Sequence, residues 1–99
     1  MIEVGIREAA GEFAEDKDIA RDLREARIAP AVEAGDTVTI DFAGVGLATQ
    51  SFIHAMISDI IRRYGSDVLD RLLFKSCNES VKAIISIVVD YSQDPESER

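Results

Sequence analysis

The stretch Thr37-Val-Thr-Ile-Asp-Phe-Ala-Gly-Val-Gly-Leu-Ala-Thr-Gln-Ser-Phe52, with the apolar run that follows it, decides the fold of this chain. Apolar and polar side chains alternate over residues 37–42, and this period predicts a strand with one buried face. Gly44 and Gly46 interrupt the alternation and predict a tight loop. Over residues 50–64 the apolar side chains follow the three-four spacing of a helix with one broad buried face. The stretch therefore predicts a strand, a glycine-rich loop and a helix.

Four further elements are expected on either side of this stretch. Residues 2–6 alternate as a half-exposed strand does, and residues 16–29 carry apolar side chains on one helical face. Pro30 disfavours helical geometry at the residue before it, so this helix either kinks there or restarts with Pro30 in a new first turn. Residues 72–74 predict a third strand, and Asn78 is a suitable N-cap for a last helix.

Strands and helices thus alternate along the whole chain. Such alternation predicts an α/β fold with a small, mostly parallel sheet and about three crossover helices. In sheets of this kind, functional groups collect where the carboxyl ends of the strands meet the first turns of the helices. That edge is expected to contain residues 43–51 and 76–79.

Composition sets further bounds on the protein. A chain of 99 residues predicts one domain, here residues 1–92, and the acidic residues 93–99 are expected to form a disordered tail. The formal net charge of −8 argues against nucleic-acid binding through phosphate contacts. With one cysteine, one histidine and no apolar run long enough for a membrane span or a signal peptide, we expect a cytoplasmic protein without metal or other cofactor.

Four stretches of the chain together resemble the sequence pattern of one protein family. They are Val38-Thr-Ile-Asp-Phe-Ala-Gly-Val45, Thr49-Gln-Ser-Phe52, Arg63-Tyr-Gly65 and the strand–helix junction from Phe74 to Lys82. They resemble the STAS-like domain family, a bacterial branch related to the anti-sigma factor antagonists in which few members have an assigned function. The resemblance covers roughly residues 18–92. It implies a layered STAS-like fold and a non-catalytic, regulatory role in binding a partner protein, such as a histidine-kinase-like ATPase.

The partner is expected to contact the loop and helix over residues 49–58. In the antagonists an Asp-Ser pair precedes this helix and the serine is phosphorylated, whereas Thr49 and Gln50 stand at those positions here. Hydroxyl groups are present at Thr49 and Ser51, which are the candidate phosphorylation sites; capping of the helix is their alternative role. His54-Ala55 replaces an acidic pair of the branch. The predicted partner-binding residues are Thr49, Gln50, Ser51, Phe52 and His54.

Two functions of other classes stay open at this point. A small acidic inhibitor or antitoxin-like protein would cover a basic site on its partner with residues 1–36, which hold ten acidic and five basic side chains. An enzyme would use Ser51, His54 and Asp41. Ser51 and His54 are neighbours because they are three residues apart on the predicted helix. Nucleophilic catalysis by these residues also needs an oxyanion site. Among these classes we expect a protein without enzymatic activity. Self-association of the domain is a further open possibility, in addition to binding of another protein.

Overall fold

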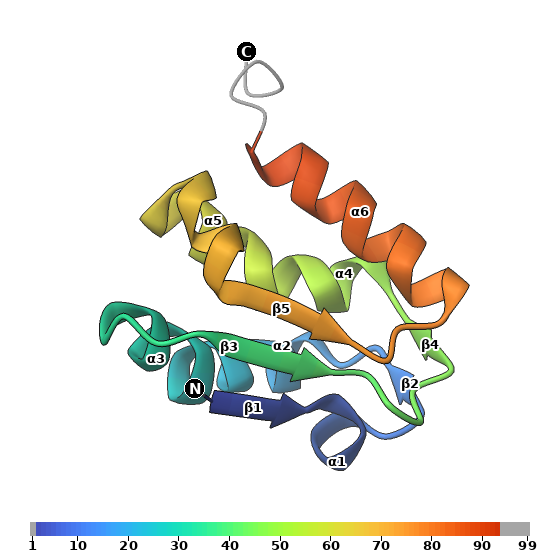
Figure 1. Cartoon of the computed structure of the whole chain (residues 1–99). Coiled ribbons are helices and arrows are strands. Elements are labelled where there is room, and N and C mark those ends of the chain that lie inside the picture. The colour runs from blue at the N-terminus through green and yellow to red at the C-terminus, as the bar shows by residue number, and fades with distance from the viewer. Residues whose placement is uncertain (1, 94–99) are drawn as a thin grey trace.

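The main sheet of the protein contains three parallel strands in the order β1-β3-β5. The structure, a computed structural model, describes residues 2–93. The strands are β1 (Ile2–Gly5), β3 (Val38–Asp41) and β5 (Leu72–Lys75). Figure 1 shows their arrowheads pointing to the same end of the molecule. The predicted α/β fold with a small parallel sheet is confirmed.

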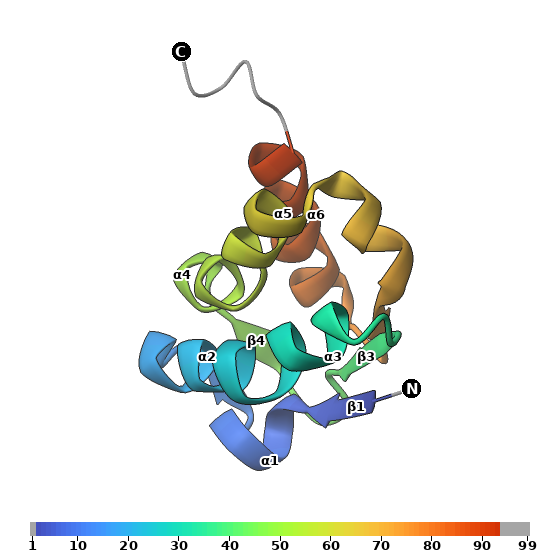
Figure 2. The same ribbon diagram turned by 90° about the vertical axis from the view of Figure 1, so that its left-hand side faces the viewer.

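Two long helical stretches connect these strands and pack on the same face of the sheet. They lie behind the sheet in Figure 1 and to its left in Figure 2. Each stretch has a π-helical segment in its middle. The first consists of α2 (Lys17–Leu23), η1 (Arg24–Ile28) and α3 (Ala29–Glu33), and the second of α4 (Gln50–Ile53), η2 (His54–Ser58) and α5 (Asp59–Tyr64).

Pro30 explains the π-helical segment of the first stretch. A proline cannot donate to the carbonyl four residues before it, and its ring crowds that carbonyl. The chain widens its turn here, and the Ala29 N–H reaches back five residues to the Arg24 carbonyl. Pro30 therefore lies in the first turn of α3, as one predicted alternative had it, but no break separates α3 from the helix before it.

The last helix, α6 (Glu79–Gln93), packs against the second stretch and begins as predicted. Asn78 Oδ1 accepts a hydrogen bond from the Val81 N–H at 2.8 Å, which is the expected N-cap contact. Further along, the buried Ser92 hydroxyl donates to Ser58 Oγ at 3.0 Å. Residues 94–99, nearly all of the expected acidic tail, lie outside the described residues.

Three short elements are not predicted by the sequence pattern. The expected strand at residues 2–6 ends at Gly5, and α1 (Ile6–Ala10) follows at once. A second parallel sheet consists of β2 (Phe13–Ala14) and β4 (Leu47–Ala48). Figure 1 shows this pair beyond the arrowheads of the main strands. The two residues of β2 and of β4 are too few to display an alternation, and the five residues of α1 span less than two helical turns.

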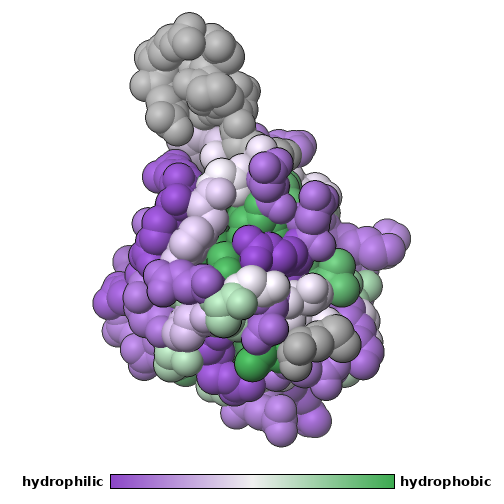
Figure 3. Space-filling view, turned by 60° about the vertical axis from the view of Figure 1, so that its left-hand side comes forward, coloured by the Kyte–Doolittle hydropathy of each residue, from purple (hydrophilic) through white to green (hydrophobic). Residues whose placement is uncertain are grey.

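The apolar core fills the space between the main sheet and the two helical stretches. Its largest fully buried side chains include Phe42, Phe52 and Met56. The side of the molecule in Figure 3 is largely hydrophilic, with an apolar area near its centre. Within residues 2–93, no helix combines the length and apolar character needed to cross a lipid bilayer.

Candidate functional site

Thr49 fixes the start of the helix that was predicted to bind a partner. Its Oγ accepts a hydrogen bond from the Phe52 N–H at 3.1 Å, and its own N–H donates to the Ala14 carbonyl at 2.9 Å. Thr49 is thus the N-cap of α4, with an extended backbone (φ −79°, ψ 157°). Of the two roles considered for the Thr49 hydroxyl, capping of the helix and phosphorylation, the structure shows the capping contact.

The capping contact leads to a measurable prediction. Thr49→Ala should lower the free energy of unfolding by about 1 kcal/mol, because the N–H groups of the first turn lose their side-chain acceptor. Gln50→Ala is the matched control, since the exposed Gln50 side chain is expected to contribute less than about 0.5 kcal/mol. Urea unfolding followed by circular dichroism measures both values. Equal stability of the two variants would contradict the capping role.

Three of the predicted site residues reach the surface together. Gln50, Ser51 and His54 are exposed, and with Lys17 and Ala55 they line an open hollow of about 420 Å³. Lys17 is the first residue of α2, so the hollow lies between the beginnings of the two helical stretches. Four of the five side chains that line it are polar or charged.

Phe52 is not part of this surface, and its assignment to the partner contact needs correction. Its side chain is fully buried, at 0% exposure. Helical spacing turns residue 52 to the opposite side from Ser51 and His54, where it packs in the core. Phe52 therefore anchors the exposed residues and does not itself present a contact to a partner.

The three residues considered for an enzyme do not come together. Asp41 Oδ1 accepts a hydrogen bond from the Ala43 N–H at 2.9 Å, at the carboxyl end of β3. Asp41 lines a separate hollow with Arg7, and Ser51 and His54 line the hollow described above. A relay of the kind that activates a serine nucleophile requires its members within hydrogen-bond reach.

Metal-binding groups are likewise dispersed in the part of the chain that the structure describes. Among residues 2–93, no three His, Cys, Asp or Glu side chains are grouped so that they could hold a metal ion. Cys77 is half-buried, and burial raises the pKa of its thiol above the ordinary value. A raised pKa disfavours the reactive thiolate at neutral pH.

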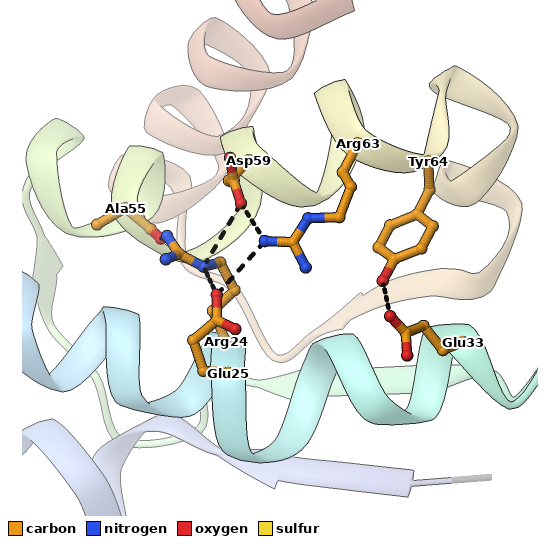
Figure 4. Close-up of polar contacts among 7 residues, drawn as sticks. All are labelled: Arg24, Glu25, Glu33, Ala55, Asp59, Arg63 and Tyr64. Atoms are coloured by element: carbon orange, nitrogen blue, oxygen red, sulfur yellow. Dashed lines mark hydrogen bonds and ion pairs between the residues drawn. The ribbon is translucent and has the colours of Figure 1, made fainter.

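A charged network joins the two helical stretches further along from the candidate surface (Figure 4). Arg24 is its centre: Nη1 donates to the Ala55 carbonyl at 2.7 Å, and Nε donates to Glu25 Oε2 at 2.8 Å. Arg63 Nη2 contacts Asp59 Oδ2 at 2.5 Å and Glu25 Oε2 at 3.5 Å. The network ties the first stretch to the π-helical segment that contains His54 and Ala55.

The network also shifts the titration of its members. The hydrogen bond from Arg24, aided by the charges of Arg24 and Arg63, lowers the pKa of Glu25. The Tyr64 hydroxyl donates to Glu33 Oε2 at 2.8 Å, and this hydrogen bond raises the pKa of Tyr64. Glu25 therefore stays ionised to lower pH, and Tyr64 stays protonated to higher pH, than the free side chains.

The protein is thus a small α/β domain in which Thr49 caps the exposed start of α4 and the buried Phe52 anchors it to the core. The model of a family described as STAS-like domain of unknown function (DUF4325) matches residues 20–82. The chain belongs to this family, which confirms the resemblance seen in the sequence. A STAS-like domain indicates a regulatory role, and domains of this kind are generally non-catalytic. No curated protein and no solved structure matches the chain.

Proposed function

We propose that this STAS-like domain is a non-catalytic regulatory module that binds a partner protein, such as a histidine-kinase-like ATPase, through the exposed face of residues 49–58. The arrangement of Gln50, Ser51 and His54 around one open hollow supports this proposal most directly. Their backbone is fixed by the Thr49 cap and by the contact from Arg24 to the Ala55 carbonyl. A preorganised polar surface binds with a smaller loss of conformational entropy than a flexible one.

Ser51 is the residue at which such binding would be regulated. It is exposed in the first turn of α4, where a phosphate would meet unpaired backbone N–H groups and Lys17 across the hollow. Phosphorylation adds about −1.5 to −2 charge units at neutral pH. The added bulk and charge weaken docking to a partner whose contact surface is fitted to the neutral, unmodified hydroxyl.

The test compares Ser51→Asp with Ser66→Asp. Ser66 is also exposed and also opens a helical segment, η3 (Ser66–Arg71), but it follows α5 and so lies beyond the opposite end of the second helical stretch from α4. Partners are crosslinked in cells of the source organism through a photoreactive residue at position 54 and identified by mass spectrometry. We expect Ser51→Asp to bind the purified partner at least about tenfold more weakly than Ser66→Asp, a difference of about 1.4 kcal/mol.

Two results would contradict the proposal. The first is a set of crosslinked proteins that Ser51→Asp and Ser66→Asp capture equally. The second is a purified partner whose dissociation constant is the same for both variants. Mass spectrometry of residues 49–51 in the cellular protein tests the modification itself, and a phosphate on Ser51 that leaves the affinity unchanged would overturn the switch.

A further inference from the structure

Two large apolar side chains stand side by side on the small sheet without serving the core. Phe13 and Leu47 are opposite each other in the register of β2 and β4, so their side chains leave the same face. Each is 50% exposed. The inward positions of the two strands are occupied by Ala14 and Ala48, which are 0% and 3% exposed. Packing therefore requires small residues at 14 and 48 but does not require large apolar ones at 13 and 47.

This apolar pair lies within four residues, along the chain, of residues that form the proposed partner surface. The strands that carry Phe13 and Leu47 lead directly into the helix starts at Lys17 and Gln50, which line the hollow around Ser51. At the other end of the pair, the Glu12 carbonyl accepts the Leu47 N–H at 3.2 Å. β2 and β4 lie at the end of the molecule to which the main strands point (Figure 1).

The surroundings of the pair are acidic. Residues 7–18 contain five carboxylates and two basic side chains, and all seven are exposed. One of the two bases, Arg7, already contacts Glu12 at 3.5 Å. Asp41 adds a further carboxylate at the carboxyl end of β3. This excess of negative charge is complementary to a basic surface and repels an acidic one.

We propose that Phe13 and Leu47 form the apolar centre of a docking surface, and that its occupant is a basic segment of the partner protein. The segment places an apolar side chain on the pair and Lys or Arg side chains against the acidic rim. An apolar centre with a charged rim is the usual anatomy of a protein interface, and central aromatic residues carry much of its binding energy. This inference rests on the proposed function and adds the chemistry of the partner to it.

The probe for this surface is a displayed library of short random peptides, selected for binding to the full chain. Selected peptides are expected to combine an apolar residue with neighbouring Lys or Arg, and to lose affinity as salt is added. We expect the double variant Phe13→Ser, Leu47→Ser to bind them at least about tenfold more weakly than the wild type. The matched control is Ile87→Ser, Tyr91→Ser on α6, where the side chains are 49% and 51% exposed.

Wild-type affinity is expected for the control variant, and thermal unfolding verifies that both double variants are folded. The proposal is overturned if no peptide is enriched, if the selected peptides lack Lys and Arg, or if both double variants bind them alike. It is also overturned if the chain forms a dimer that Phe13→Ser, Leu47→Ser abolishes, because the occupant would then be a second copy. This test can fail while capture of the partner still depends on Ser51. That combination would refute the docking surface and leave the proposed function in place.

Discussion

Replacement of Phe52 by alanine is expected to lower the free energy of unfolding by about 3–5 kcal/mol. The side chain is 0% exposed, so its removal loses apolar burial and leaves a cavity that the helices around it can fill only in part. Domains of this size have a total stability of about 5–15 kcal/mol. The variant should therefore lose a large fraction of its stability, which urea unfolding will measure.

Phe13→Ala is the control for this prediction. It removes the same side chain from a site that is 50% exposed, and the expected loss is no more than about 1 kcal/mol. Similar losses for Phe13→Ala and Phe52→Ala would show that Phe52 is not a core residue. The contrast also matters for the design of binding experiments. Loss of partner binding by Phe52→Ala would indicate that the domain has unfolded, whereas loss of binding by Ser51→Asp would indicate that the partner contacts the exposed surface.

Arg24→Ala should have the second largest effect, a loss of about 1.5–3 kcal/mol in the free energy of unfolding. The Arg24 side chain is only 16% exposed, and its charge-assisted hydrogen bond to the Ala55 carbonyl has no replacement in the variant. The contacts of Nε with Glu25 and Asp59 disappear at the same time. Chemical denaturation gives the loss, and hydrogen exchange of residues 54–58 is expected to become faster because this segment loses its tie to the first helix.

Arg21→Ala provides the comparison on the same helix. Arg21 is 54% exposed and contacts one carboxylate, that of Asp18 at 3.3 Å. Exposed pairs of this kind contribute little, so we expect a change within about 0.5 kcal/mol. If Arg24→Ala is as mild as Arg21→Ala, the network of Figure 4 does not hold the two helical stretches together.

Much of the fold could be predicted because its main elements bury one face each. The period of two at residues 37–42 and the three-four spacing at residues 50–64 follow directly from that burial. β2 and β4 escaped prediction because two residues carry no period. The π-helical segment at His54–Ser58 contains no proline or glycine that could mark it in the sequence, and its contact with Arg24 joins residues 31 positions apart.

The candidate site could be predicted in part for the same reasons. Gln50, Ser51 and His54 occupy the polar side of a recognisable amphipathic helix, and the structure finds them exposed. Phe52 was placed among the contacts by its nearness in sequence, although the helical period puts it in the core. The exposed pair Phe13 and Leu47 could not be predicted from the sequence, because single exposed apolar residues are common. Only the register of β2 with β4 brings the two side chains together.

The parallel order of the main sheet has a consequence for how the chain reaches this fold. Ile2 pairs with Val38 and Val38 with Leu72, so each pairing closes a loop that contains an entire helical stretch. All strand pairs among residues 2–93 are parallel, so this part of the chain has no β-hairpin as a local starting point, and long loop closures slow the search for the folded state. During synthesis the helices can form early, but β3 keeps an open edge until β5 leaves the ribosome. The newborn chain is most vulnerable to aggregation in that interval.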